Sequence, residues 1–262
     1  LEDWIGLFYH CGRRMPEFDF FLGIKPKSEQ FRARNMIVEA AQQFDCDRIL
    51  MMDDDMVIDW EKRGRDAYDE MLKKLIGHDK DICGILYYQR GQECSPVLMT
   101  KISEKGYRFL REDEITHSLQ RVDVAGGGCL LIKTRVFDRI SQPYFAAEYE
   151  FGTDIQLCRK AAEKGFEIWA DTSIELGHLR NEKVVVTSQN RHQFQDGVPI
   201  SHKRSFVMSD LFQRLIDDVN KCYELTTPEV FYRGQQPREI DDNVSDADNY
   251  RKFPIDRVCR QV

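Results

Sequence analysis

Three consecutive aspartates, Asp53, Asp54 and Asp55, indicate chemistry more directly than any other stretch of this sequence. They follow the apolar run 49–52, which predicts a short buried strand that ends at the first aspartate, because aspartate is a poor strand residue. Adjacent carboxylates repel one another and are costly to remove from water, and a bound cation relieves both costs. Carboxylate oxygens suit Mg²⁺ or Mn²⁺. The turn therefore predicts a divalent-metal site, with a solvated acidic turn as the alternative.

Asp154 is a second residue whose position suggests chemistry. It opens a helix predicted over residues 154–164, which Gly165 stops, and a short strand follows at 166–170. As a helix cap, its carboxylate would gain about 0.3–1 kcal/mol from the field of the helix N-terminus. As a general base, the same carboxylate would remove a proton from a hydroxyl group during its attack.

Further polar or glycine-rich positions lie near predicted strand and helix ends. His178 ends the strand segment 174–178, where a histidine is commonly packed or solvated. Residues 126–128 are all glycine and precede a strand at 129–133, which fits a bulge or tight turn. They do not match a phosphate loop, because no Lys-Ser or Lys-Thr directly follows the last glycine. Arg34, with Arg32 and Asn35, stands at the start of a helix predicted over 31–44.

The order of these segments resembles the GT-A glycosyltransferases. The resemblance covers roughly residues 18–180 and consists of Asp-x-Asp after a strand, a glycine-rich strand, a Thr-Asp helix, a glycine-aromatic strand and Gly-His. Many members have Glu-Asp where this chain has Thr153-Asp154, so the chain departs from the pattern at Thr153. The resemblance implies a GT-A, Rossmann-like α/β fold with a mixed, mostly parallel sheet flanked by helices and a C-terminal extension.

The resemblance also implies a function and a set of site residues. The function is Mn²⁺- or Mg²⁺-dependent transfer of a sugar from a UDP- or GDP-sugar to an acceptor hydroxyl of unknown identity, with inversion. Asp154 would be the base. The implied metal ligands are Asp53, Asp55 and His178. The implied nucleotide-sugar contacts are Arg34, Asp53, Asp54, Gly127 and Gly128.

Three alternative functions remain open at this point. A retaining enzyme would keep the metal site and give Asp154 a positioning role. A nucleotidyltransferase would also use Mg²⁺ and clustered aspartates, but it usually carries a basic, glycine-rich loop near its start, which is not visible here. A sugar-binding domain without turnover would keep the fold but would have no need of Asp53, Asp55, Asp154 and His178 together.

The arrangement of predicted elements determines how these residues could meet. The chain reads helix, strand, helix, strand up to residue 52, for which a parallel sheet is the natural solution. The remaining predicted elements are a strand at 18–24, helices at 1–15, 61–77, 135–140 and 209–223, strands at 81–88 and 184–187, and a hairpin with strands at 97–102 and 107–110. Because such sheets usually begin with a strand, we expect a further strand upstream of Leu1. We expect residues 1–180 to form the catalytic domain and residues 181–262 an extension whose end, from 226, is a polar tail or an arm bound to a partner.

Composition limits the function classes. Of 262 residues, 42% are hydrophobic and 32% charged, as in soluble globular proteins, and no apolar run approaches the about 20 residues of a membrane helix. The net charge of −7 and the pI of about 5.5 argue against a nucleic-acid-binding surface as the main function but leave a nucleic-acid acceptor open. The eight cysteines are scattered without Cys-x-x-Cys spacing, and no signal peptide is visible, so we expect a cytoplasmic location.

Overall fold

The structure is a computed structural model of the 262-residue chain. It describes residues 2–24, 29–59, 61–64, 66–91, 93–103, 106–146, 152–181, 184–195, 230–234 and 255–258. Proximity of Cα atoms divides the chain into two compact units, Leu1–Glu29 with Arg204–Val262, and Gln30–Lys203. These units group residues differently from the expected functional division at residue 180, which stays a prediction. In the described part of the chain, no helix combines the length and apolarity needed to cross a membrane.

The first unit contains a helix and a small antiparallel sheet. Helix α1 (Glu2–Arg14) buries Leu7, Phe8 and Cys11. Strand β1 (Phe21–Ile24) pairs antiparallel with β13 (Val230–Gly234), which pairs antiparallel with β14 (Ile255–Val258). The strand predicted at 18–24 is therefore present, but it joins this separate sheet and not a parallel one.

The C-terminal part of the first unit modifies one expectation and leaves another untested. Two segments of the expected polar tail, β13 and β14, are strands, and β13 pairs with β1 at the other end of the chain. The helix expected at 209–223 lies outside the described residues. The extension thus contributes regular structure to the unit that also contains α1.

The second unit, Gln30–Lys203, is built on a five-stranded sheet. Its strand order is β2 (Arg48–Met52), β9 (Cys129–Lys133), β4 (Ile82–Leu86), β10 (Ile168–Glu175) and β7 (Leu119–Val122). Its longer helices are α2 (Gln30–Gln43), α3 (Asp66–Gly77) and α4 (Thr153–Glu163). The unit has two smaller three-stranded sheets. One has the order β12 (Val184–Val186), β11 (Gly177–Asn181), β3 (Met56–Val57), and the other has the order β6 (Tyr107–Phe109), β5 (Leu98–Lys101), β8 (Val124–Ala125). The fold class is therefore mixed α/β, as expected.

The expectation of a mostly parallel sheet is wrong. Among the described strands of the central sheet, β4 and β10 form the one parallel pair, and the other three pairings are antiparallel. Strands β2, β4 and β10 do run in one direction, as helical crossovers require, but β9 lies between β2 and β4 and runs opposite to both. The chain reaches β9 from β7 and β8 (Val124–Ala125) without a long helix, and such short connections favour antiparallel pairing.

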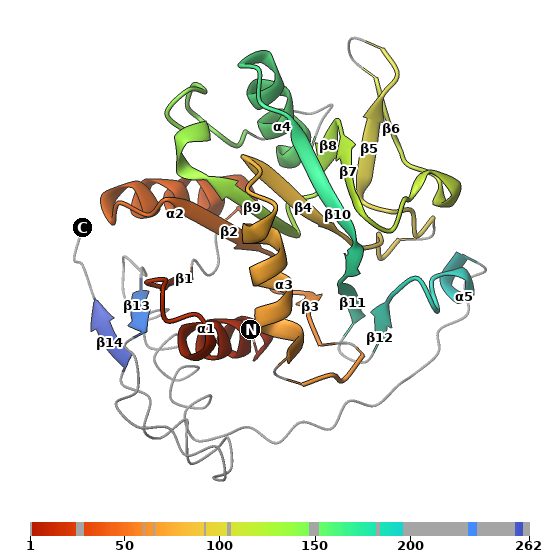
Figure 1. Ribbon diagram of the computed structural model, residues 1–262. Coiled ribbons are helices and arrows are strands. Elements are labelled where there is room, and N and C mark those ends of the chain that lie inside the picture. The colour runs from red at the N-terminus through yellow and green to blue at the C-terminus, as the bar shows by residue number, and fades with distance from the viewer. Residues whose placement is uncertain are drawn as a thin grey trace. The chain divides into compact units, whose positions relative to one another are not determined.

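Helices cover both faces of the central sheet. Helices α2 and α4 lie on one face and α3 crosses the other (Figure 1). Alternation along β4 explains this division: Ile82 belongs to the main core cluster with Val38 of α2 and Leu157 of α4, whereas Cys83 and Ile85 are buried outside that cluster. Each fully buried aliphatic side chain contributes about 1.5–3 kcal/mol, so both faces stabilise the sheet.

The other predicted elements agree with the structure in most places. Strands β5 (Leu98–Lys101) and β6 (Tyr107–Phe109) form the predicted antiparallel hairpin, and β12 (Val184–Val186) is the predicted edge strand. Helix α3 begins at Asp66, later than expected. The segment predicted as a helix at 135–140 contains only the 3₁₀ turn Thr134–Val136 and further turns.

The small sheet β12-β11-β3 has a direct consequence for the site. Strand β11 (Gly177–Asn181) pairs antiparallel with β3 (Met56–Val57), the strand that follows the three aspartates, and His178 is opposite Met56. The backbone N–H of Leu179 donates to the carbonyl oxygen of Asp55 at 2.8 Å. This pairing brings His178 to the aspartate turn from more than 120 residues away in sequence.

A buried carboxylate joins β10 to the end of α3. Asp171 is 1% exposed, and its Oδ2 lies 2.7 Å from Nε2 of His78 and 3.5 Å from Nζ of Lys74. Its Oδ1 accepts hydrogen bonds from the backbone N–H and hydroxyl of Ser173 at 2.9 and 2.5 Å. Burial would raise the pKa of Asp171, but the hydrogen bonds from Ser173 and His78 and the charge of Lys74 hold it below its usual value.

We expect Asp171→Asn to lower the free energy of unfolding by about 1–3 kcal/mol near neutral pH, because buried donors lose their charged acceptor. A carboxyl with a depressed folded pKa contributes stability above its unfolded pKa, about 3.9, and loses it as the pH falls through the folded value. Urea unfolding from about pH 7 to about pH 3 should therefore show a steeper loss for the wild type than for Asp171→Asn. The exposed Asp138→Asn is the control, and equal pH profiles for Asp171→Asn and the wild type would contradict this role.

Candidate functional site

The aspartate turn lies between β2 and β3 in the second unit. The backbone N–H of Asp53 donates to the carbonyl oxygen of Gly128 at 2.9 Å, so the pairing of β2 with β9 continues into the turn. Asp53 and Asp55 are half-buried, whereas Asp54 is exposed. The three adjacent carboxylates therefore differ in their exposure to solvent.

Arg34 of α2 binds two of the predicted site residues. Its Nη2 donates to Oδ1 and Oδ2 of Asp53 at 3.0 and 3.3 Å, and its Nη1 donates to Oδ1 of Asp154 and to the Thr153 hydroxyl. Gln30 adds a hydrogen bond from Nε2 to Asp53 Oδ2 at 3.2 Å. The side chain of Arg34 is only 5% exposed. Sequence reasoning assigned Arg34 to the nucleotide, but here it joins Asp53 to Asp154.

Asp55 belongs to a second cluster. Its Oδ2 lies 3.3 Å from Nε2 of His178 and accepts a hydrogen bond from Nη1 of Arg90 at 2.5 Å. The side chain of His178 is 13% exposed and that of Asp55 is 19% exposed. The structure thus brings His178 to Asp55, as the sequence predicted, and adds Arg90, which sequence reasoning missed. Arg90 lies in a polar loop after β4, and nothing in the sequence distinguishes it from other loop arginines.

The hydrogen bonds of His178 fix its tautomer. Its Nδ1 is 2.7 Å from the carbonyl oxygen of Tyr88, and because a carbonyl oxygen only accepts, Nδ1 carries a proton. In a neutral imidazole, Nε2 is then a bare lone pair that faces the carboxylate of Asp55. Two such acceptors repel one another unless the ring is doubly protonated or a cation lies between them. The rings of Tyr87 and His178 pack edge to face with their centroids 5.6 Å apart, and this contact supports the His178 ring in its position.

The two aspartates differ in their electrostatic environment. Burial raises the pKa of Asp53 more than Arg34 lowers it, and the charges of Asp154 and Asp55 add to the rise. Burial would also raise the pKa of Asp55, but the hydrogen bond and charge of His178 and the charge of Arg90 hold it below its usual value. Asp55 is therefore the more readily ionised carboxylate, whereas Asp53 is engaged in an ion pair with the buried Arg34.

The donor set fits a divalent cation that takes part of its coordination from elsewhere. No group of three or more His, Cys, Asp or Glu side chains in the described ranges converges as a complete metal cage. Asp55 and His178 offer one oxygen and one nitrogen at a spacing of 3.3 Å. Mg²⁺ is commonly held by one or two carboxylates together with substrate phosphates and water, and a carboxylate–imidazole pair also suits Mn²⁺.

The glycines at 126–128 are explained by packing. A Cβ on Gly127 would lie 2.6 Å from Cζ and the terminal nitrogens of Arg34, and one on Gly128 would lie 2.7 Å from Cζ of Tyr87. The N–H of Gly128 donates to the Tyr87 hydroxyl at 3.0 Å. The roles of Gly127 and Gly128 towards a nucleotide sugar stay predictions, but both glycines already make room for side chains of the site.

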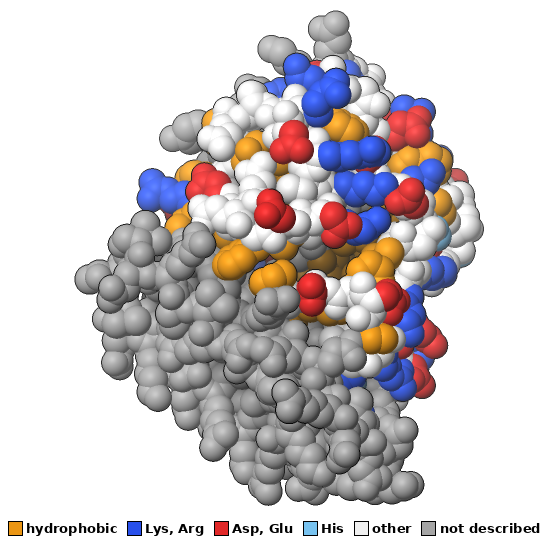
Figure 2. Space-filling model, turned by 60° about the vertical axis from the view of Figure 1, so that its left-hand side comes forward, with side chains coloured by type: hydrophobic (Ala, Val, Ile, Leu, Met, Phe, Trp, Pro, Cys, Tyr) orange, Lys and Arg blue, Asp and Glu red, His pale blue; other side chains and the backbone are white. Residues whose placement is uncertain are grey.

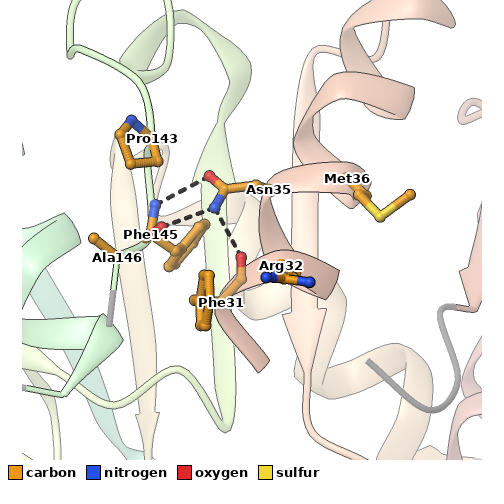
Figure 3. Close-up of a pocket in the computed structure, with 7 residues that line it drawn as sticks. All are labelled: Phe31, Arg32, Asn35, Met36, Pro143, Phe145 and Ala146. Carbon is orange, nitrogen blue, oxygen red and sulfur yellow. Dashed lines mark hydrogen bonds between the residues drawn. The ribbon is translucent and has the colours of Figure 1, made fainter. Parts of the chain in front are cut away.

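A hollow of about 360 Å³ lies at the start of α2. Figure 3 shows Asn35 at its wall, where the amide accepts from the N–H of Phe145 and donates to the carbonyl oxygens of Phe145 and Phe31. The lining residues are Phe31, Arg32, Asn35, Met36, Pro143, Phe145 and Ala146. Neither the predicted metal ligands nor the predicted base are among the residues that line this hollow. Phe145 links it to the site, because the guanidinium of Arg34 lies 5.7 Å from the Phe145 ring centroid.

The described part of the face in Figure 2 carries acidic and basic side chains interspersed over its surface. An extended area of one sign, which a nucleic-acid acceptor would favour, is not seen on that described part.

Similarity to known proteins does not assign a family. No protein-family model matches the chain, and no curated protein matches it. Among solved structures, the crystal structure of A197 from STIV is similar with a TM-score of 0.44 and 18% sequence identity, over 71% of this chain and 82% of that chain. A likeness of this degree carries no argument about function, so the site has to be interpreted from its own geometry.

We expect Gly127→Ala to lower the free energy of unfolding by about 1–3 kcal/mol, because the added methyl group forces the buried Arg34 guanidinium from its two carboxylates. Gly77→Ala is the matched control, since a Cβ there would meet no atom within 4 Å outside its own chain neighbours and helix backbone. Because glycine costs a helix about 0.5–1 kcal/mol relative to alanine, that control should be as stable as the wild type or more so. Denaturant unfolding measures both, and a Gly127→Ala protein of wild-type stability would show that Arg34 is not held as described.

Proposed function

We propose that this chain is a GT-A-like, metal-dependent glycosyltransferase that moves a sugar from a nucleotide-sugar donor to an acceptor hydroxyl. The observation that carries the proposal is the pair formed by Asp55 and His178. Their acceptor atoms, Oδ2 and Nε2, face one another at 3.3 Å while the Tyr88 carbonyl oxygen keeps the proton of His178 on Nδ1. When His178 is neutral, such a pair favours a cation between its members, whereas a doubly protonated ring would itself donate to Asp55. The GT-A resemblance of the sequence supplies the reaction class, and both the fold family and the activity are part of the proposal.

The proposed role of the cation is to stabilise negative charge on the leaving group. When bound by Asp55 and His178, Mn²⁺ or Mg²⁺ would act as a Lewis acid for the diphosphate leaving group of a UDP- or GDP-sugar. Asp53 stays a predicted ligand, but Arg34 and Gln30 bind its two carboxylate oxygens, so we propose Asp55 and His178 as the main ligand pair. Asp53 instead keeps Arg34, and through it Asp154, in place.

Asp154 is the proposed base. Its Oδ1 is bound by Arg34 and Thr153, and among the described residues no hydrogen-bond donor is directed at Oδ2. The side chain is 26% exposed, and we assign the proton transfer to Oδ2 because Oδ1 is bound by Arg34 and Thr153. In the proposed step, the acceptor hydroxyl transfers its proton to Oδ2 of Asp154 as its oxygen attacks the anomeric carbon, and the bond from that carbon to the diphosphate breaks. Arg34 fixes the orientation of the carboxylate during this transfer.

Asp55→Asn and His178→Ala should each weaken Mn²⁺ binding by at least about tenfold, because the first removes the charge of the ligating carboxylate and the second removes the ligating nitrogen. Both proteins should stay folded, since Asp55 and His178 are not core residues. Asp54→Asn is the matched control: it removes one charge from the same turn at an exposed position and should leave Mn²⁺ affinity within about twofold. Mn²⁺ titration followed by calorimetry or electron paramagnetic resonance measures the three variants. Equal weakening by all three would indicate a diffuse electrostatic effect and not a ligand pair.

Asp154→Asn should reduce sugar transfer by about 10²–10⁴-fold, the usual contribution of a general base, while Mn²⁺ and nucleotide binding persist. Asparagine keeps the size of the side chain and can still accept from Arg34. The rate of transfer from a UDP- or GDP-sugar to an acceptor, with the configuration of the product, is the measurement. A product of retained configuration, or near-normal transfer by Asp154→Asn, removes Asp154 from the role of base. Transfer of a nucleotidyl group in place of the sugar would favour the nucleotidyltransferase alternative.

A further inference from the structure

Two arginines neutralise the aspartate turn, and they are held very differently. Arg34 is 5% exposed and is bound by two carboxylates and a threonine hydroxyl. The side chain of Arg90 is 54% exposed, and the described contact of its guanidinium is with Asp55 alone. An ion pair with one exposed partner contributes little stability and exchanges readily. Arg90 is therefore the cation that can leave the turn.

The backbone around Arg90 is anchored, so only its side chain has to move. The N–H of Gln89 donates to the Ser95 carbonyl oxygen and that of Val97 to the Tyr87 carbonyl oxygen, each at 2.9 Å. Tyr88 forms an isolated bridge with Pro96. Tyr88 is also the residue whose carbonyl oxygen fixes His178. The base of the loop is thus tied to the candidate metal ligands, and Arg90 extends from it towards Asp55.

Arg90 and a metal ion compete for the same atom. Oδ2 of Asp55 accepts from Arg90 at 2.5 Å and also faces Nε2 of His178 at 3.3 Å. A divalent cation between Asp55 and His178 would repel a guanidinium at this distance. Released from Asp55, the guanidinium would be free to bind phosphates held by that cation, since arginine binds phosphate oxygens through paired N–H groups.

We propose that Arg90 is a diphosphate-binding residue that turns from Asp55 to the nucleotide diphosphate when the metal–nucleotide complex binds. This inference rests on the proposed function, since it takes the Asp55–His178 pair as the metal site. In the free protein, Arg90 keeps the carboxylate of Asp55 neutralised. In the complex, it interacts with the second phosphate of the donor. The exchange makes metal and nucleoside diphosphate bind cooperatively, because each one favours the same position of Arg90.

The test uses the full chain and titrates Mn²⁺ alone, and then UDP, UMP, GDP and GMP with Mn²⁺ present. Arg90→Gln should bind Mn²⁺ alone as tightly as the wild type or more tightly, because a competing cation is gone. Arg90→Gln should bind the preferred nucleoside diphosphate at least about tenfold more weakly than the wild type does, which is the loss expected for a charged hydrogen bond. Its affinity for the matching monophosphate should stay within about twofold of the wild-type affinity. Arg90→Lys keeps the charge but not the paired N–H groups, so its affinity for the diphosphate should lie between those of the wild type and Arg90→Gln.

Arg121→Gln is the matched control, since Arg121 is 65% exposed and pairs with Glu167 on the sheet. It should leave all of these affinities unchanged. If Arg90→Gln binds the diphosphate as well as the wild type does, or loses mono- and diphosphate equally, the inference is wrong while the proposed function stands. If the wild type binds no nucleoside diphosphate with Mn²⁺, the proposed function and this inference both fail.

Discussion

The buried guanidinium of Arg34 is the interaction on which the described site depends. An arginine keeps its charge at any physiological pH, so once buried it needs acceptors around it. The chain provides Asp53 at the end of β2 and Asp154 at the start of α4, which are 19 and 120 residues away in sequence. Gly127 leaves the space that the guanidinium occupies. The Arg34 guanidinium thereby holds four segments in one mutual arrangement: helix α2, the aspartate turn, the glycine turn at 126–128 and helix α4.

This arrangement divides three adjacent aspartates among different environments. Asp53 is used internally, Asp54 is exposed, and Asp55 faces His178 and Arg90. Because Asp53 is neutralised from the protein interior, the charge of Asp55 remains available at the surface of the turn. A buried arginine on one side and an exposed one on the other give the two carboxylates distinct environments although they are only two residues apart.

The topology of the sheets decides which distant residues reach the turn. Strand β9 inserts between β2 and β4 and carries the glycine turn to the backbone of Asp53, and β11 pairs with β3 and carries His178 to Asp55 (Figure 1). Both pairings are antiparallel. The site is therefore built by the antiparallel additions to the three co-directional strands β2, β4 and β10, and the departure from a parallel sheet is what completes it.

The sequence by itself determined the mixed α/β class, most strands and helices, and the end of β2 at the aspartates. These features follow from local periodicity and from the poor strand propensity of aspartate. Only the tertiary structure decided that β9 runs against β2 and β4, that Arg34 binds Asp53 and Asp154, and that Arg90 faces Asp55. The physical reason is that strand pairing and ion pairing between segments far apart in sequence leave no periodic pattern, and an arginine of any loop looks the same until the fold brings a carboxylate to it.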